Sequence, residues 1–382
     1  MSEPPVREAV HAYFMQRAIE LARNGWYTAR PNPRVGCVLV RDESVIGEGW
    51  HERAGQAHAE KAALADVDQR GNTARGATAY VTLEPCSHTG RTAPCTDALI
   101  GAEVARVVIG AADPNPQVDG RGVARLREAG IEVITDILSQ RCAALNHGFN
   151  QRMRARRPRV RVKLAMTLDG RTAAANGSSQ WITGEAARDD VHRLRAESGA
   201  VMIGRATLQA DDPSLNVRLS GQWPQPLRVV LDSGLAIPPG ARMLALEGDT
   251  LVYTASTDTA RIRAVEQTGA RVIKIEQRDA GLDLVAVLAD LGGREINDVL
   301  VEAGPTLAGA LAGAGLIDEY LIYMAPKLLG DGGRGLLHLP QIGRIQDARE
   351  LTIDSVEPCG SDWRITARPS SRKERQACLP EL

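Results

Sequence analysis

Apolar residues recur along the first 150 positions with two alternating periods, one typical of helices and one typical of strands. From Glu8 to Arg23 they repeat at helical spacing, and Asn24-Gly25 follows as a typical stop signal. Shorter apolar runs bounded by polar turns indicate strands. We expect helices at 8–23, 58–64 and 121–129, and strands at 36–40, 44–47, 77–83, 104–110 and 131–134. The alternation predicts an α/β layer architecture.

The same alternation resumes after residue 160. We expect strands at 160–166, 200–203, 227–232, 250–253, 271–275, 298–302 and 319–324, and helices at 185–195, 282–291 and 306–314. A chain of 382 residues, at roughly 150 residues per domain, should form two domains with a remainder. We therefore predict two α/β domains, at 1–150 and 151–368, and a polar tail at 369–382 that we expect to be mobile.

An arginine-rich segment separates the two predicted domains. Six arginines lie between Arg152 and Arg161, around Pro158. A basic patch that binds nucleic acid and a solvated linker are both consistent with this composition. The net charge of −1, from 46 basic and 47 acidic residues, favours the linker.

Composition and charge argue against several classes of partner. A net charge near zero provides no chain-wide field that would attract nucleic acid or an anionic membrane. Aromatic residues make up only 3% of the chain, too few for rows of base-stacking platforms. The uncharged run at 303–317 is shorter than the roughly 20 apolar residues of a membrane span, and no secretory signal opens the sequence. We therefore expect a cytoplasmic protein with no nucleic-acid or membrane partner.

The first predicted domain contains a pattern typical of a catalytic zinc site. His58-Ala59-Glu60 opens a predicted helix, Cys86 follows a strand, and Cys95 lies at the entry to another helix. One imidazole and two thiolates would bind a single zinc ion and leave its fourth position open for water. Zinc would lower the pKa of that water, and Glu60 would carry its proton, as in nucleobase deaminases. Residues i and i+2 of a helix point apart, so this motif requires a helix entrance.

Each of these residues also has a plain structural interpretation. His58 alone could be a surface or capping histidine, and Cys86 alone a buried apolar residue. Their combination favours zinc, although eight residues separate the two cysteines where the usual deaminase pattern has two. A longer loop beside the metal can line a substrate pocket. We interpret the remaining cysteines as buried or incidental thiols: Cys37, Cys142, Cys359 and Cys378.

Three segments together resemble the deaminase half of the bifunctional riboflavin-biosynthesis deaminase/reductase family. They are 31–38 (Pro-Asn-Pro-Arg-Val-Gly-Cys-Val), 58–60 (His-Ala-Glu) and 84–95, from Glu-Pro-Cys to Pro-Cys. The resemblance implies a cytidine-deaminase-like three-layer domain that hydrolytically deaminates 2,5-diamino-6-ribosylamino-4(3H)-pyrimidinone 5′-phosphate. It also implies substrate contacts by Asn32, His51, His88 and Arg91, the last at a position where many relatives carry lysine. Without the resemblance, Asn32 would be interpreted as a turn residue and His51 as a surface residue.

The second predicted domain resembles the reductase half of the same family. The resemblance covers residues 163–335 and includes the segments 163–171, 179–183, 205–207, 211–213 and 301–309. It implies a dihydrofolate-reductase-like fold and NADPH-dependent reduction of the ribosyl side chain to ribityl. The product would be 5-amino-6-ribitylaminouracil 5′-phosphate.

The resemblance also implies contacts in the reductase half. The implied NADPH contacts are Ala165, Trp181, Thr207, Asp211, Ser233, Gly304, Pro305, Thr306, Leu307, Ala308, Gly309 and Ala310. The implied substrate contacts are Ser179, Arg195, Leu215, Arg218 and Glu302. Physical chemistry agrees, because a turn that enters a helix presents N–H groups to a pyrophosphate and a guanidinium can bind phosphate with two hydrogen bonds. Taken singly, each arginine is better interpreted as a surface charge, and the turn by itself is only the start of a helix.

Lys163 is the candidate that would polarise or protonate the sugar oxygen. The alternative is a strand lysine paired with a carboxylate. We also expect a homo-oligomer. Two other functions remain to be weighed, a nucleic-acid deaminase and a non-catalytic, zinc-stabilised nucleotide sensor in which Glu60 is only a helix residue. Net charge, scarce aromatics and the whole second domain argue against the first, and an open zinc position argues against the second.

Overall fold

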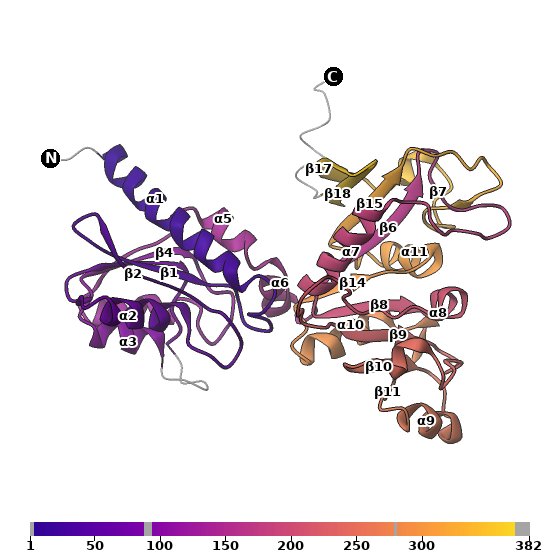
Figure 1. Cartoon of the computed structure of the whole chain (residues 1–382), viewed down its shortest axis with the longest axis horizontal. Helices are drawn as coiled ribbons and strands as arrows, with labels where there is room; N and C mark the ends of the chain where they lie inside the picture. Colours follow the sequence, from indigo (N-terminus) through magenta and orange to yellow (C-terminus); the bar gives the residue numbers. More distant parts are fainter. Residues whose placement is uncertain (1–3, 88–93, 279–280, 371–382) are drawn as a thin grey trace. The chain divides into compact units, whose positions relative to one another are not determined.

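The structure is a computed structural model that describes residues 4–87, 94–278 and 281–370. Contacts divide the chain into two compact units, Met1–Arg156 and Arg157–Leu382. Each unit is built on a sheet with helices on its faces, so the prediction of two α/β units is confirmed (Figure 1). Within the described ranges, no helix is long and apolar enough to cross a membrane.

The first unit contains a five-stranded sheet in the order β2-β1-β3-β4-β5. Strand β1 pairs antiparallel with β2 and β3, whereas β3, β4 and β5 are parallel. The strands are β1 (Gly36–Arg41), β2 (Ser44–Trp50), β3 (Thr78–Leu83), β4 (Arg106–Ala111) and β5 (Glu132–Ile134). The helices are α1 (Pro4–Ala22), η1 (Arg23–Gly25), α2 (Ala59–Gln69), α3 (Cys95–Gly101), α4 (Arg121–Glu128), α5 (Ser139–Ala144) and α6 (His147–Ala155). Every element predicted here forms, although α2 continues well beyond its predicted end at residue 64.

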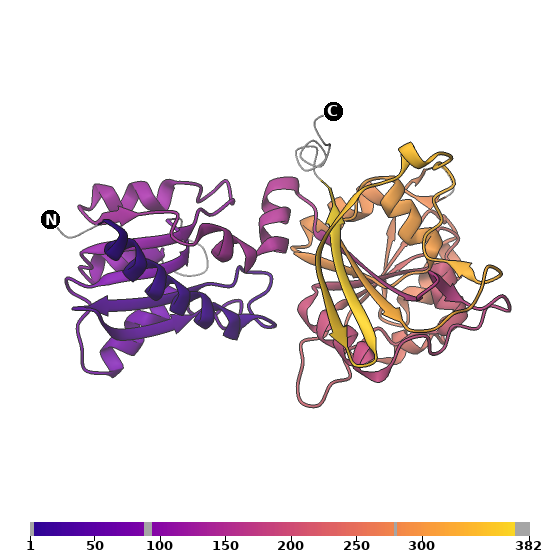
Figure 2. The same cartoon turned by 90° about the horizontal axis from the view of Figure 1, so that it is seen from above.

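Side chains of β1 alternate between two cores, one on each face of this sheet. Cys37 and Leu39 pack with apolar side chains of α2, α3 and α4, whereas Val38 and Val40 pack with those of α1 and α5. A strand sends successive side chains to opposite faces, so a strand buried on both faces reads as a continuous apolar run. The first unit is therefore a three-layer α/β/α sandwich (Figures 1 and 2).

The second unit contains a nine-stranded sheet in the order β11-β10-β9-β8-β14-β6-β15-β18-β17. The strands from β11 to β15 are parallel, and β18 and β17 continue the sheet antiparallel. The strands of this sheet are β6 (Arg159–Thr167), β8 (Ala200–Gly204), β9 (Leu227–Leu231), β10 (Thr250–Thr254), β11 (Arg271–Lys274), β14 (Asp298–Val301), β15 (Glu319–Ala325), β17 (Leu351–Cys359) and β18 (Asp362–Pro369). Two small ribbons pair β7 (Arg171–Ala173) with β16 (Arg334–Gly335) and β12 (Gln277–Arg278) with β13 (Gly281–Leu282).

Helices cover both faces of the nine-stranded sheet. They are α7 (Glu185–Glu197), α8 (Arg205–Asp211), α9 (Thr259–Glu266), α10 (Leu284–Gly293) and α11 (Pro305–Gly313), with short helices η2 (Arg242–Ala245) and η3 (Ile345–Asp347). On β6, Val160, Val162 and Leu164 belong to the core beneath α10 and α11. The alternation of the strand sends Arg161 and Lys163 to the opposite face, where α7 packs. The central strand thus presents charged side chains beneath one helix.

The second part of the arginine-rich segment is not a solvated linker, which corrects that interpretation. Arg157 forms a bidentate pair with Asp318 at 2.6 and 2.8 Å, and both Arg159 and Arg161 bond to Glu319 at 2.6 and 2.7 Å. These arginines belong to β6 or precede it directly, and their acidic partners lie at the start of the adjacent strand β15. Sequence alone does not show this pairing because the partners are about 160 residues apart.

The hairpin β17–β18 has no counterpart in the predicted elements. Its side chains are largely exposed, including Ile353 at 61%, Val356 at 50% and Trp363 at 44%. A strand that lies at the sheet edge without a covering layer lacks the clear apolar alternation that identifies strands. The hairpin reaches Pro369, and Ser370 N–H donates to the carbonyl of Glu350. The first two residues of the expected tail are therefore held at this edge, and the rest lie outside the described residues.

Candidate functional site

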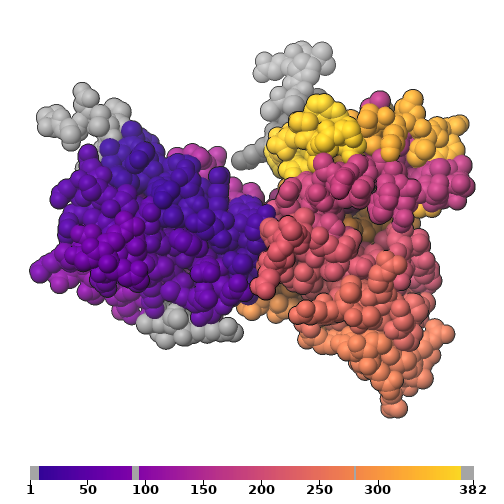
Figure 3. Space-filling model, in the orientation of Figure 1, coloured from indigo at the N-terminus to yellow at the C-terminus, as the bar shows by residue number. Residues whose placement is uncertain are grey.

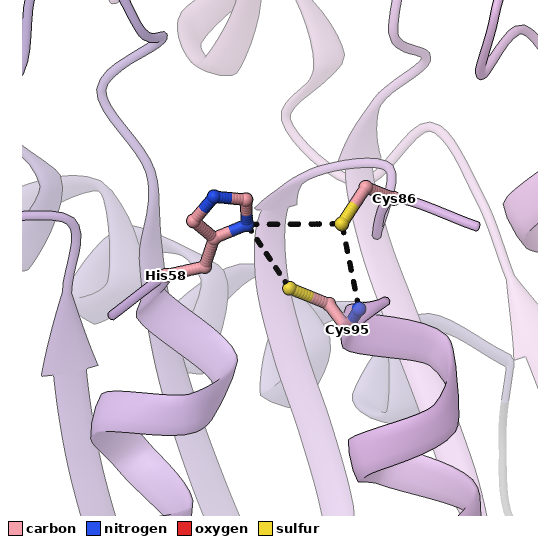
Figure 4. Close-up of side chains that lie close together, drawn as sticks. All are labelled: His58, Cys86 and Cys95. Atoms are coloured by element: carbon pink, nitrogen blue, oxygen red, sulfur yellow. Dashed lines mark hydrogen bonds between the residues drawn. The ribbon is translucent and has the colours of Figure 1, made fainter. Parts of the chain in front are cut away.

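His58, Cys86 and Cys95 converge in the first unit (Figure 4). Their ligand atoms all lie within 4.8 Å of one another. His58 Nδ1 is 3.2 Å from Cys95 Sγ and 3.7 Å from Cys86 Sγ, and the Cys95 N–H donates to Cys86 Sγ at 3.4 Å. One ring nitrogen and two sulfurs at this separation fit the tetrahedral geometry that zinc prefers. The three residues fit a metal ion as the sequence predicts.

Local backbone conformation brings the three ligands together. His58 is the N-cap of α2 with extended backbone angles of φ −73° and ψ 162°, so it stands just before the helix. Cys86 follows the end of β3, and Cys95 is the first residue of α3. Glu60, in the first turn of α2, is only 3% exposed and interacts with Cys95. The helix entrance that the His-x-Glu motif requires is present.

The charges at this centre favour metal binding and proton transfer. A hydrogen bond from Cys95, aided by His58 and opposed by burial, holds the pKa of the Cys86 thiol well below its usual range. Cys86 therefore tends toward the thiolate form that zinc requires. Burial, with a contribution from the charge of Cys86, raises the pKa of Glu60. A raised pKa makes a carboxylate a stronger base, which suits a group that takes a proton from water.

Asn32 and His51 lie beside the metal-binding residues. His51 Nδ1 donates to the Ala57 carbonyl at 3.0 Å, so its Nε2 accepts the amide N–H of Asn32 at 3.0 Å. The rings of His51 and His58 meet edge to face with centroids 5.3 Å apart. Burial lowers the pKa of His51, consistent with a neutral ring. This hydrogen bond uses the amide nitrogen of Asn32 and does not involve its side-chain carbonyl oxygen, which is a hydrogen-bond acceptor.

Two of the predicted substrate contacts, His88 and Arg91, lie outside the described residues. Two other acidic residues near the centre were assigned no role from the sequence. Glu84 accepts hydrogen bonds from the backbone N–H groups of Gly120, Gly122 and Val123, and so fixes the Pro85-Cys86 turn against the start of α4. Burial and the nearby charges of Glu84 and Cys86 raise the pKa of Asp113 to about 6. The Glu-Pro-Cys motif was visible in the sequence, but the backbone N–H groups that the Glu84 carboxylate binds could not be identified from it.

A second cluster of charges lies beneath α7 in the other unit. Arg195 forms a bidentate pair with Glu302 at 2.6 and 2.9 Å. Burial alone would raise the pKa of Glu302, but Arg195 outweighs it and holds this pKa below its usual range. Lys163 is partly buried, and the charges of Glu302, Arg195 and Asp211 influence its pKa. Lys163 forms no salt bridge with any residue in the described part of the chain, in contrast to the alternative of a strand lysine paired with a carboxylate.

The turn before α11 is open for a ligand. Gly304 caps the helix without a side-chain hydrogen bond, and a Cβ added there would meet nothing within 4 Å. The Gly304 N–H donates a hydrogen bond to the hydroxyl oxygen of Thr207 at 3.4 Å, so two of the predicted NADPH contacts lie together. The carboxyl ends of β8 and β14 carry these two segments, as in open α/β sheets that bind ligands at that edge. The geometry fits the pyrophosphate of a dinucleotide.

Other predicted contacts of the reductase half lie apart from this cluster. Trp181 is 65% exposed, and Arg188 stacks over its ring at 5.0 Å. Lys327 Nζ donates to the carbonyls of Trp181 and Ile182 at 3.0 and 2.7 Å. Ser233 bonds through its carbonyl to Thr254 and Ala255. Within the described ranges, no hydrogen bond or salt bridge joins Ser179, Ser233 or Trp181 to the Arg195 cluster.

Comparison with known families matches both units. Residues 158–365 match the RibD C-terminal domain, and residues 8–111 match the cytidine and deoxycytidylate deaminase zinc-binding region. The riboflavin biosynthesis protein RibD of Escherichia coli is 48% identical over 362 residues, which cover 92% of this chain and 97% of the relative. RibD of Haemophilus influenzae is 45% identical and covers 93% and 96%, respectively.

Solved structures give the same result. Acinetobacter baumannii RibD matches with a TM-score of 0.88 and 42% identity, covering 95% of this chain and 100% of that chain. A deaminase/reductase from Thermotoga maritima matches with a TM-score of 0.84 and 34% identity over the same shares. Similarity over nearly the whole length of these relatives includes both sheets and both clusters of candidate residues.

Proposed function

The chain belongs to the RibD family of bifunctional deaminases and reductases of riboflavin biosynthesis, and we propose the substrates and residues for its two reactions. The solved Thermotoga maritima relative is described as a diaminohydroxyphosphoribosylaminopyrimidine deaminase and 5-amino-6-(5-phosphoribosylamino)uracil reductase. We assign the same pair of substrates to this chain. The first unit would deaminate the pyrimidine, and the second would reduce the ribosyl side chain of the deaminated product to ribityl.

In the first reaction, water replaces the amino group at C2 of 2,5-diamino-6-ribosylamino-4(3H)-pyrimidinone 5′-phosphate, and ammonia leaves. His58, Cys86 and Cys95 would hold one zinc ion, which supplies Lewis-acid activation of the water. Glu60 would take the proton from the water and return it to the ring nitrogen and the leaving ammonia. The proposed contacts to the base and phosphate are Asn32, His51, His88 and Arg91.

In the second reaction, a hydride from NADPH reaches C1′ of the ribosylamino group. The bond between C1′ and the ring oxygen breaks, and that oxygen gains a proton. We propose that Lys163 supplies or stabilises this proton, and that Ser179, Arg195, Leu215, Arg218 and Glu302 contact the substrate. The proposed NADPH contacts are Ala165, Trp181, Thr207, Asp211, Ser233 and the turn at 304–310. The cofactor supplies the reducing equivalent, and the protein aligns it.

The observation that carries this proposal is the convergence of His58, Cys86 and Cys95 beside buried Glu60, in a chain whose other unit holds a charged cluster under α7. The decisive experiment supplies the phosphorylated diaminopyrimidinone and NADPH to the purified protein. We expect one ammonia released and one NADPH oxidised per substrate. Ammonia without NADPH oxidation would contradict the proposed reductase, and oxidation of NADPH only with already deaminated substrate would contradict the deaminase.

Zinc removal should abolish deamination and leave reduction unchanged. We expect about one zinc per chain, because three protein ligands leave the fourth position for water. Dialysis against a chelator should stop ammonia release and preserve NADPH oxidation with deaminated substrate, and added zinc should restore the first activity. Cys86→Ser should lose zinc, whereas Cys142→Ala, which removes a buried thiol of α5 away from the centre, should retain it. Active deaminase without bound zinc, measured by elemental analysis, would disprove the assignment.

The homo-oligomer expected from the sequence is also part of this proposal. The hairpin β17–β18, yellow in Figure 3, lies at the surface of the second unit. It exposes the apolar side chains of Leu351, Ile353, Val356 and Trp363. Apolar side chains gathered on a surface commonly mark an interface between proteins. We expect light scattering to give a mass that is a multiple of 41.0 kDa, and the double variant Ile353→Glu/Trp363→Glu to reduce it. A monomeric wild-type protein would refute this point. The cytoplasmic location also stays a prediction.

A further inference from the structure

The segment 215–218 connects the two arginines of the reductase half that are proposed to contact substrate. The backbone carbonyl of Asn216 accepts a hydrogen bond from Arg195 Nη1 at 2.9 Å. Its side-chain oxygen Oδ1 accepts a hydrogen bond from Arg218 Nη1, also at 2.9 Å. Leu215, which precedes Asn216, is buried and has a positive φ of 55°. One residue therefore holds both guanidinium groups.

Helix α7 fixes the other end of this segment. His192 Nδ1 accepts the backbone N–H of Arg218 at 3.3 Å, one turn before Arg195 on the same helix. Arg195 is fixed on its other side by the bidentate pair with Glu302. Arg218, by contrast, is exposed, and its guanidinium donates a hydrogen bond to the side chain of Asn216. The side chain of Asn216 is thus the contact that orients Arg218.

The surroundings of these residues are electropositive. Burial, together with the charges of Arg195 and Arg218, lowers the pKa of His192 to about 4, so its ring is neutral at physiological pH. Burial and the charges of Arg195 and Arg242 lower the pKa of Arg218, with Glu302 as the opposing charge. Glu302 is already paired with Arg195. Guanidinium groups held together against their mutual repulsion are typical of a site for a phosphate dianion.

We propose that Asn216 is a positioning residue that holds Arg218 next to Arg195 for the phosphate group of the reductase substrate. This inference rests on the proposed function, in which both arginines contact the phosphorylated substrate. Asn216 suits the role because its amide oxygen accepts from a guanidinium without neutralising its charge. An aspartate at the same position would keep the acceptor but would add a negative charge beside the phosphate.

The test compares variants on two substrates, the deaminated phosphorylated compound and the same compound after enzymatic removal of its phosphate. For Asn216→Ala we expect the KM of the phosphorylated substrate to rise about tenfold, with kcat within a factor of about two, as for loss of one charge-assisted contact. The KM of the dephosphorylated substrate should stay unchanged. Arg218→Ala should show the same pattern, and the double variant should be no worse than Arg218→Ala, because the two residues act through one contact.

Gln225 provides a matched control. Its side chain bonds to the N–H and carbonyl of Val217 at 2.8 and 3.3 Å, so Gln225→Ala loosens the same segment while Asn216 keeps its own hydrogen-bonding groups. We expect a smaller change that is equal for both substrates. Ammonia release by the first unit and the unfolding temperature of each variant report on folding.

The outcomes separate the inference from the proposed function. If Arg218→Ala raises the KM of the phosphorylated substrate and Asn216→Ala does not, the positioning role is overturned and the phosphate contact stands. If Gln225→Ala matches Asn216→Ala, or if Asn216→Ala affects both substrates equally, the segment needs only general rigidity and the inference fails. If Arg218→Ala shows no dependence on the phosphate, the proposed contact fails, and the role of Asn216 fails with it.

Discussion

Replacement of Glu60 by alanine or glutamine is expected to slow deamination by about 10²–10⁴-fold, the usual contribution of a general acid–base residue. Both Glu60 variants should oxidise NADPH at the wild-type rate when they are given the deaminated substrate. The physical reason is that water must lose a proton and ammonia must gain one, and Glu60 is the buried carboxyl group beside the three metal-binding residues. Glutamine keeps the shape and the hydrogen-bonding capacity of the side chain but cannot carry the proton.

Three measurements on the same preparation make this result specific. Ammonia release reports deamination, NADPH absorbance reports reduction, and elemental analysis reports zinc, which both variants should keep because Glu60 is not one of the three proposed ligands. Glu48→Gln is a matched control, since Glu48 pairs with Arg17 on the surface of the same unit. Normal deamination by Glu60→Gln would contradict the proton-transfer role. Loss of zinc from that variant would instead assign Glu60 to the metal centre.

The predicted elements formed wherever the apolar pattern is strong, and the reason lies in burial. Strand β1 is buried on both faces, so its continuous apolar run was recognisable in the sequence. Strand β17 lies at an edge, with most of its residues exposed, and its composition resembles that of a loop. The short helices α6, α8 and α9 were also absent from the prediction, because such short helices carry too little periodicity.

The candidate metal centre was more predictable than the charged cluster of the second unit. Histidine and cysteine are the residue types that bind zinc, and two short motifs in the sequence contain His58, Cys86 and Cys95. The partners of arginines cannot be identified in this way, because any carboxylate in the chain could serve. The pairs Arg195–Glu302 and Arg161–Glu319 join positions more than 100 residues apart. The alternating Arg-Val-Arg-Val-Lys-Leu run of β6 was nevertheless a visible sign that one face of this strand is charged.

Replacement of Lys163 by methionine is expected to slow reduction by about 10²–10⁴-fold and to leave deamination unchanged. Lys163 lies on the same face of β6 as Ala165, a proposed NADPH contact, and the alternation of the strand points both toward α7. Burial lowers the pKa of Lys163, and Arg195 adds to this effect, while Glu302 and Asp211 oppose it. Methionine fills nearly the same volume without the charge or the proton, so a large loss of rate would reflect chemistry rather than packing.

The pH profile and a second substitution define which property of Lys163 matters. An acid loses activity as the pH rises through its pKa, and burial places this pKa below the ordinary 10.5, so the wild-type rate of reduction should fall on the alkaline side. Lys163→Met should lack that limb. Lys163→Arg keeps the positive charge, but its guanidinium cannot donate a proton. If Lys163 protonates the sugar oxygen, this variant should be as slow as Lys163→Met. If Lys163 only polarises the sugar oxygen, this variant should be much faster than Lys163→Met. Lys274→Met, at an exposed lysine of β11, is the control. A Lys163→Met variant that reduces substrate at a rate close to that of the wild type would show that Lys163 has only a structural role in the strand.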